Sequence, residues 1–251
     1  MHIVEGIDDL RPSFGPIFVV VGVFDGLHRG HAYLLEHLIA ESAARDARPT
    51  VITFDHHPDE ILMGAAPPLL LDPADRIERL GAAGIEVTVV QRFDEVLRQT
   101  PYEVFVARIR DRVALSGFLM TPETAFGFQR GGTPETMTAL GLEDGFDVAV
   151  VPTFSLDGQE VRSSAIREAI VSGDLGSAAR LLGRPVTVTG SIGAVDGRSR
   201  LAFPLPVALP PEGEYPVTVD GAARSLRIER GDAYLLGEIP NDRVTVAFSG
   251  A

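Results

Sequence analysis

Two histidines lie three residues apart in the stretch FDGLHRGH (residues 24–31), directly after an apolar run rich in β-branched residues. If a helix begins near Leu27, His28 and His31 lie on one face of its first turn. Cations there oppose the helix dipole, whereas a bound anion would be attracted by the dipole, the backbone N–H groups and the side chains together. The spacing therefore predicts a phosphate site; the alternative is a pair of surface histidines beside a turn.

Two glycines and an arginine in this stretch fit a phosphate ligand. Gly26 and Gly30 have no Cβ, so an anion can approach the backbone closely at either position. Within a helix, Gly30 otherwise costs about 1 kcal/mol relative to alanine. Arg29 adds a positive charge between the histidines.

A second helix start with positive charge lies in VRSSAIREAI, residues 161–170. Ser163 or Ser164 can serve as the N-cap, and Arg162 and Arg167 flank that position. Serine hydroxyls, unpaired N–H groups and an arginine in the first turn together suit an anion. The alternative is an ordinary helix cap with a solvated arginine.

The stretch TFDHHPDE (residues 53–60) ends the second predicted strand and raises the question of a metal site. Asp55, His56 and His57 are possible ligands, but adjacent side chains rarely point the same way. We therefore expect no direct metal ligation by the protein. Pro58 is expected to shape a loop beside the same pocket.

Several chemistries are excluded by what the sequence lacks. It contains no cysteine, and all 22 basic residues are arginine. Disulfides, a cysteine nucleophile, Schiff-base chemistry and a Walker-type lysine are therefore absent. A GxGxxG motif after a strand and a GxSxG motif are also missing, which disfavours dehydrogenases and serine hydrolases.

Charge and hydropathy limit the partners and the compartment. The net charge of −13 argues against nucleic acid or an anionic membrane as a partner, although a local cationic pocket can still bind a small anion. No apolar run reaches the ~18 residues of a membrane span. The acidic N-terminus is unlike a signal peptide, so a cytoplasmic protein is expected. The oligomeric state is not indicated.

Alternating apolar and amphipathic segments predict the fold. Strands are expected over residues 17–24, 49–54, 85–93, 117–123 and 146–154. Helices are expected over 32–47, 73–84, 100–113 (Thr100 as cap, Pro101 first), 163–173 and 174–183. This alternation predicts a doubly wound parallel sheet. After residue 185, strands at 186–195, 214–221, 225–236 and 243–248 predict a small antiparallel module over 186–251.

The motifs GVFDGLHRGH, VITFDHHPDEIL, GFQRGG and VRSSAIREAIVSGDLGSAARLLGRP occur in this order over roughly residues 15–190. This combination resembles the HxGH-type nucleotidyltransferases. Among them it is most similar to the FAD synthetase module of bacterial bifunctional riboflavin kinase/FAD synthetases. The resemblance implies a Rossmann-like nucleotidyltransferase domain over residues 1–185, then a shortened, degenerate kinase-like β module over 186–251.

The resemblance also implies a reaction and its participants. ATP and FMN would give FAD and pyrophosphate, with Mg²⁺ bridging the phosphates. Because the FMN phosphate is largely dianionic at neutral pH, it needs no general base to attack the α-phosphorus. The implied catalytic residues are His28, His31 and Arg167. The implied ATP-binding or loop-shaping residues are Gly22, Phe24, Asp25, Gly26, Gly30, Arg162, Ser163 and Ser164. The implied flavin-side residues are Phe54, His57, Pro58, Phe126 and Phe128.

Two departures from the family pattern leave alternatives open. Where the family has GxDFxFG, this chain has Glu123 and Ala125 in place of the glycine and the acidic residue, so another phosphate-monoester acceptor is an alternative to FMN. Where the kinase has GFPTAN, Phe203 and Pro204 persist but the threonine and asparagine do not. We therefore expect no riboflavin kinase activity. A non-catalytic flavin- or nucleotide-binding regulator is the other alternative.

Overall fold

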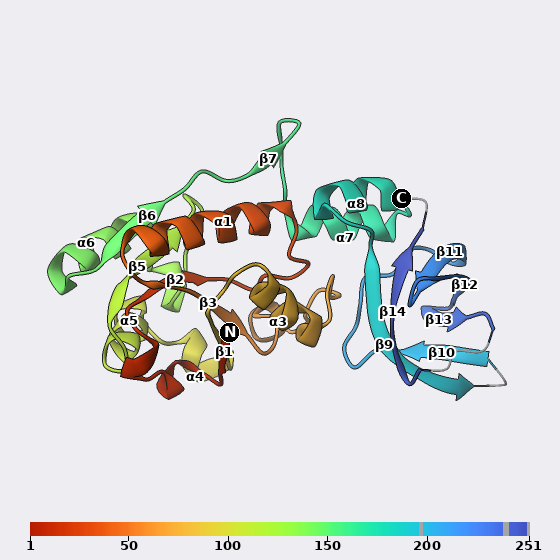
Figure 1. Ribbon diagram of the computed structural model, residues 1–251, viewed down its shortest axis with the longest axis horizontal. Coiled ribbons are helices and arrows are strands. Elements are labelled where there is room, and N and C mark those ends of the chain that lie inside the picture. The colour runs from red at the N-terminus through yellow and green to blue at the C-terminus, as the bar shows by residue number, and fades with distance from the viewer. Residues whose placement is uncertain (196–197, 238–240, 250–251) are drawn as a thin grey trace. The chain divides into compact units, whose positions relative to one another are not determined.

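The chain divides into two compact units, and each draws on separate segments of the sequence (Figure 1). The computed structural model describes residues 1–195, 198–237 and 241–249. The sheet unit comprises residues 1–24, 30–67 and 77–154. The barrel unit comprises residues 25–29, 68–76 and 155–251. The boundary after residue 185 that the sequence suggests remains a prediction.

Six parallel strands form the sheet, which confirms the predicted doubly wound architecture. They are β1 His2–Val4, β2 Ile17–Val21, β3 Arg48–Phe54, β4 Val87–Gln91, β5 Leu115–Met120 and β6 Asp147–Val150. Their order is β1-β4-β3-β2-β5-β6, so chain crossovers run from β2 to β3 and β4 on one side and return to β5 and β6 on the other. The carboxyl ends of strands at such a reversal are where doubly wound sheets bind ligands.

Helices cover both faces of the sheet. They are α1 Arg29–Ala44, α2 Asp59–Met63, α3 Pro73–Ala82, α4 Glu95–Arg98, α5 Tyr102–Arg110 and α6 Pro134–Asp144, with short 3₁₀ helices at Ile7–Asp9, Pro12–Phe14 and Phe128–Arg130. Phe105 of α5 and Met137 of α6 belong to the core cluster that includes strand residues. Leu38 of α1 and Leu80 of α3 are buried outside that cluster, in keeping with right-handed crossovers that place these helices on the opposite face.

The sequence pattern missed β1, α2, α4 and α6. β1 has only three residues, and its parallel pairing with β4 is a long-range contact that no local pattern shows. α6 did have local signals, because Thr133 caps it, Pro134 begins it and Gly145 ends it in the left-handed conformation.

Two helices begin later than the sequence predicts. α5 has Pro101 as its N-cap rather than its first residue, and Thr100 donates its hydroxyl to the carbonyl of Val96 instead of capping. α1 begins at Arg29, which is later than the start near Leu27 that the histidine spacing assumed, although the apolar spacing predicted the helix only from residue 32. The second difference matters for function, because it places His28 before the helix.

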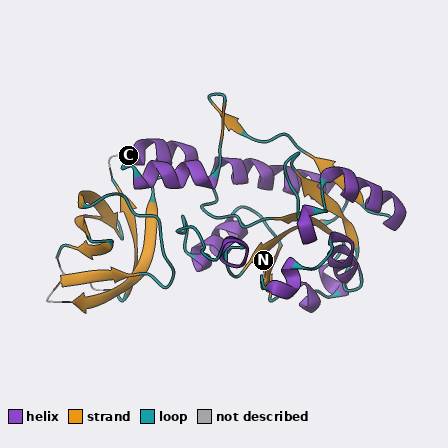
Figure 2. Ribbon diagram, turned by 180° about the vertical axis from the view of Figure 1, so that it is seen from behind, coloured by secondary structure: helices purple, strands orange, loops and turns teal. Residues whose placement is uncertain are grey.

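The barrel unit carries two helices and the antiparallel strands that the sequence predicts. Its elements are β7 Ser155–Leu156, β8 Gln159–Glu160, α7 Ser163–Val171, α8 Leu175–Leu182, β9 Thr187–Val195, β10 Arg198–Ala202, β11 Gly213–Val219, β12 Ala222–Glu229, β13 Asp232–Leu235 and β14 Arg243–Phe248. Six strands close into a barrel in the order β10-β13-β12-β11-β14-β9 (Figure 2). The sequence pattern did not show the closure or the strands β7, β8 and β10, and it predicted residues 225–236 as one strand where the structure has β12 and β13. No described helix is both long and apolar enough to cross a membrane.

Candidate phosphate-binding site

The loop after β2 has a constrained backbone. Phe24 and Leu27 have positive φ angles of 55° and 39°, which are uncommon for residues with a Cβ. Gly26 has φ 83°, and a Cβ there would lie 2.9 Å from the side chain of Leu70. The glycine predicted to admit a phosphate is therefore also required by packing inside the barrel unit. Such strain persists only where surrounding contacts hold the backbone, often at a functional loop.

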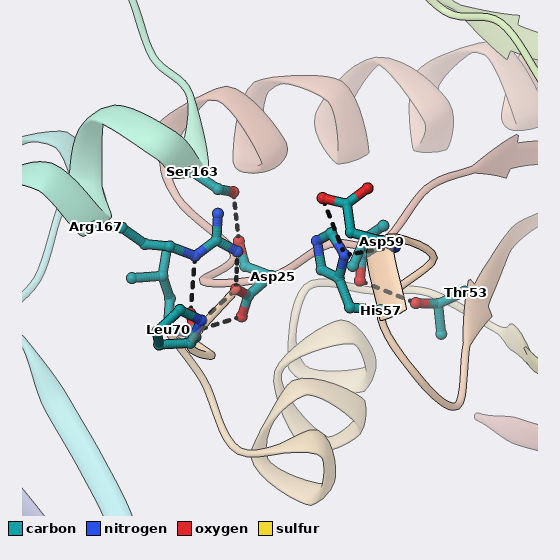
Figure 3. A network of polar contacts seen from close by, with 9 residues as sticks. Asp25, Thr53, His57, Asp59, Leu70, Ser163 and Arg167 are labelled. Carbon is teal, nitrogen blue, oxygen red and sulfur yellow. Dashed lines mark hydrogen bonds and ion pairs between the residues drawn. The ribbon is translucent and has the colours of Figure 1, made fainter. Parts of the chain in front are cut away.

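Asp25 is the centre of these contacts (Figure 3). Its carboxylate is 3% exposed, accepts the backbone N–H of Leu70 at 3.0 and 3.1 Å, and pairs with Arg167 at 2.6 Å. Its backbone carbonyl accepts the hydroxyl of Ser163 at 3.0 Å. A buried carboxylate satisfied in this way is an anchor for the loop rather than a base or an open metal ligand.

Arg167 links Asp25 to a second segment of the barrel unit. Its Nη2 contacts Asp25, and its Nε donates to the carbonyl of Pro68 at 2.8 Å. Within the described part of the chain, its Nη1 has no hydrogen bond. The guanidinium is therefore fixed in orientation and still has donors for an anion.

The start of α7 is left open by its own side chains. Ser163 or Ser164 was expected to cap this helix, but the N-cap is Arg162, whose side chain makes no capping hydrogen bond, and the Ser163 hydroxyl donates to the backbone carbonyl of Asp25. Ser164 is exposed as the second helical residue, and Arg162 pairs with Glu160. Among the residues that the structure describes, no side chain accepts from the first-turn N–H groups of α7, which is the condition for anion binding at a helix N-terminus.

Arg184 is a site residue that the sequence analysis did not identify. It donates to the carbonyl of Gly26 at 2.5 Å and to that of Leu27 at 3.2 Å. It therefore holds the loop through two backbone carbonyls, in addition to the contacts made by the Asp25 carboxylate. Its place after the Gly183 helix stop suggested only a chain boundary, so no local signal pointed to this role.

His28 is buried among these groups and is neutral at pH 7. Only 5% of its surface is exposed. Burial, followed by the charges of Arg184 and Arg167, lowers the pKa of His28 from 6.5 to about 4. The position of His28 in the sequence suggested a cation at a helix start, and the low pKa and the start of α1 at Arg29 contradict that expectation.

The sheet unit contains the other residues of the first motif. The His31 ring lies 5.0 Å from the ring of Phe24, which is buried. A Cβ at Gly22 would lie 3.0 Å from the Phe24 ring, so this glycine provides space for it. Gly30 is the second residue of α1. His31 is thus oriented by an aromatic contact, and its role remains a prediction.

The predicted flavin-side residues have different environments within the sheet unit. Phe126 packs into the core, 5.6 Å from Phe105 and 6.0 Å from Phe118 between ring centres, whereas Phe128 is 44% exposed. The three others lie near the end of β3: Phe54 packs against Phe93, His57 accepts the N–H of Asp59 through Nδ1 (Figure 3), and Pro58 precedes α2. Phe128 is therefore the better aromatic surface, and Phe126 has a core role.

The histidine pair after β3 does not converge on one point. His56 Nδ1 lies 3.2 Å from Asp55, and His57 Nδ1 lies 3.6 Å from Asp59. Among the described residues, no group of three or more histidine or carboxylate side chains is placed to hold a metal ion.

A family model and the sequences of curated relatives agree on the family to which this chain is similar. The model of the family described as FAD synthetase matches residues 11–165, more than half of the chain. A bifunctional riboflavin kinase/FMN adenylyltransferase of Pseudomonas fluorescens is 30% identical over 76% of this chain and 62% of its own length. The protein with the same description from Escherichia coli K12 is 29% identical over 88% of this chain and 74% of its own length.

The chain spans less than two thirds of the length of the Pseudomonas protein and of a similar relative from Haemophilus influenzae. A solved structure also matches: the crystal structure of a protein described as a macrolide-efflux protein from Streptococcus pneumoniae has a TM-score of 0.79, over 98% of this chain and 88% of that one. At 22% identity, this similarity concerns the fold alone.

Proposed function

Because the chain belongs to the FAD synthetase family, we propose that it transfers the adenylyl group of ATP to FMN, giving FAD and pyrophosphate. One observation supports this most directly. The buried contacts of Asp25 hold together a cationic site whose helix, α7, has an N-terminus without a side-chain cap. Such a site suits the polyphosphate of a nucleotide.

The β- and γ-phosphates are the groups proposed to bind at α7. The hydroxyl of Ser164 and the first-turn N–H groups, that of Ser163 included, would donate to phosphate oxygens, and Arg167 would add its unused nitrogen. Because Asp25 and Pro68 hold the guanidinium in place, little side-chain entropy is lost on binding. These are the phosphates that leave as pyrophosphate.

His28 would act as a neutral or newly protonated donor to this anion. Bound polyphosphate offsets the charges of Arg184 and Arg167, two of the causes of its low pKa, and therefore raises that pKa. A histidine that gains a proton as negative charge accumulates beside it contributes a stronger, charged hydrogen bond to the anion than a neutral histidine would. The role of His31 rests on the motif.

The bond changes need no protein base. A phosphate oxygen of FMN attacks the α-phosphorus of ATP, and the bond from that phosphorus to the pyrophosphate oxygen breaks. Since the attacking oxygen already carries negative charge at neutral pH, the protein's contribution is positioning and charge stabilisation.

Mg²⁺ is proposed to enter with ATP, held by phosphate oxygens. The described residues contain no ready-made carboxylate cage, and Asp25 is occupied by Arg167 and Leu70. The ion would neutralise phosphate charge. No lysine can do so, because the sequence contains no lysine.

Riboflavin kinase activity is not part of the proposal. The loop from β10 to β11 lines a barrel cavity of about 380 Å³ with Phe203 and a series of proline and aliphatic residues, and Arg200 and Asp232 line the same cavity. The hydroxyl and amide groups of the kinase motif are missing from this lining.

The test is a chromatographic assay of the purified protein with ATP and Mg²⁺, with FMN in one reaction and riboflavin in another. FAD from FMN, and no product from riboflavin, is the expected result. FMN formed from riboflavin would contradict the loss of kinase activity. If neither flavin reacts but calorimetry detects ATP binding, a different phosphate acceptor or a regulatory role replaces the proposal.

A further inference from the structure

The segment Pro68–Arg76, which follows α2 and includes the first turn of α3, is built into the barrel unit although its neighbours in sequence are not. Leu69 forms a parallel β-bridge with Val207 in the loop between β10 and β11. Its N–H donates to the carbonyl of Pro206 at 2.8 Å, and its carbonyl accepts the N–H of Ala208 at 2.9 Å. The segment thus adds a short strand to the loop of the barrel.

Two barrel strands hold the other end of this segment through side chains. Arg243 of β14 pairs with Asp72 at 2.9 Å, and Thr189 of β9 donates its hydroxyl to Asp75 at 2.5 Å. Asp72 also accepts the N–H of Ala74 at 2.8 Å at the start of α3. The segment is therefore anchored by both the backbone and the side chains of the barrel.

The middle of the same segment holds the phosphate loop. The N–H of Leu70 donates to both oxygens of the Asp25 carboxylate, and the carbonyl of Pro68 accepts from Arg167. The Leu70 side chain also fills the space next to Gly26. If the segment moved, the buried Asp25 carboxylate would lose hydrogen-bond donors. Leaving a buried carboxylate without donors costs free energy.

We infer that the barrel positions the ATP-phosphate loop through Pro68–Arg76, and that Arg243 and Thr189 are positioning residues for adenylyl transfer. Neither residue contacts His28, Ser163 or Arg167 in any hydrogen bond or ion pair within the described chain, so their effect passes through the segment. This inference rests on the proposed function for its catalytic consequence. It gives the degenerate β module a role that needs no kinase chemistry.

The test combines hydrogen–deuterium exchange with ATP binding in the full chain. The variant Thr189→Val with Arg243→Gln removes both side-chain anchors, and Arg243→Gln alone serves if the double variant unfolds. The control is Arg227→Gln, which breaks an exposed ion pair with Glu214 on the same barrel. Arg243→Lys keeps the charge and should retain most of the wild-type exchange protection and affinity for MgATP.

We expect faster exchange in peptides covering both 68–76 and 25–29, and an affinity for MgATP that is roughly tenfold lower, with kcat reduced less than kcat/KM. The control should match the wild type. Faster exchange in 68–76 without any change in 25–29, or an unchanged affinity for MgATP, would overturn the inference. If the wild type binds no ATP, the proposed function fails, and exchange in residues 25–29 alone decides whether the barrel holds the loop.

Discussion

Helices α7 and α8 follow one another in the barrel unit and lie side by side, yet their N-termini are built in opposite ways (Figure 1). α8 is capped by its own sequence: Asp174 accepts the N–H of Ser177 at 2.9 Å. α7 has Arg162 at its cap, and the side chain of Arg162 makes no hydrogen bond to the first turn. The hydroxyl that could cap α7 instead holds the carbonyl of Asp25.

This difference separates a stabilised helix start from one kept available for a ligand. At α8 the bonds to the N–H of Ser177 also lower the pKa of Asp174, so the carboxylate remains charged at the positive end of the helix dipole. At α7 both nearby arginines are paired with carboxylates, Arg162 with Glu160 and Arg167 with Asp25, but the positive end of the dipole has no capping side chain, which is unfavourable until an anion binds. An unfavourable arrangement that other contacts maintain is typical of a functional site.

The largest difference between the two helices is expected when one arginine on each is replaced by alanine. Arg167→Ala should lower the rate of FAD formation at least ~100-fold and weaken ATP binding, because it removes a charge-stabilising donor and the partner of the buried Asp25. Arg180→Ala on α8 removes an arginine paired with Asp157 at the surface and should leave the rate within about twofold. Equal effects of the two variants, measured by steady-state kinetics, would remove the distinction between the helices.

A pH effect should be visible in stability and traceable to His28. Its pKa is about 4 when folded and 6.5 ordinarily, so below pH 6.5 the unfolded chain takes up a proton that the folded chain does not. Stability is therefore complete above pH 6.5 and is lost as the pH falls toward 4, by about 2 kcal/mol between pH 7 and 5. Denaturant unfolding should show this loss, and His28→Gln should flatten it. A profile that is the same in both proteins would contradict the low pKa.

Installing a cap on α7 should exchange function for stability. Arg162→Asp would give α7 a carboxylate where α8 has Asp174, stabilising the helix by about 1 kcal/mol. The same carboxylate would occupy the N–H groups and repel phosphates, so the affinity for ATP should fall roughly tenfold. Thermal unfolding and calorimetry measure the two effects. A variant that gains stability and binds ATP normally would show that the open helix start is not used.

The smallest effect is expected from removing the existing cap. Asp174→Ala should lower the melting temperature by on the order of 2–4 °C, because the first turn of α8 loses its acceptor. FAD formation at a temperature where both proteins are folded should be unchanged. A clear loss of activity would mean that α8, too, contributes to the site.

Sequence-based prediction was accurate where an element depends on neighbouring residues and inaccurate where it depends on contacts with distant segments. The start of α8 at Asp174 and its end at Gly183 were predicted correctly, because a capping aspartate and a left-handed glycine act within one turn. The parallel sheet was also predicted, since buried strands require apolar runs. The start of α1 was misplaced, because the positive φ of Leu27 depends on contacts from distant segments.

The sequence by itself determined the alternation of strands and helices, the chemistry available without lysine or cysteine, and the two motifs that contain His28 and, separately, Ser163 with Arg167. Tertiary structure alone decided how those residues are used. It brought Arg184 to the carbonyl of Gly26 and removed the charge of His28 at neutral pH. It also assigned the Ser163 hydroxyl to Asp25 instead of its own helix. Each outcome depends on burial and on partners tens of residues or more away in the chain, which local spacing does not encode.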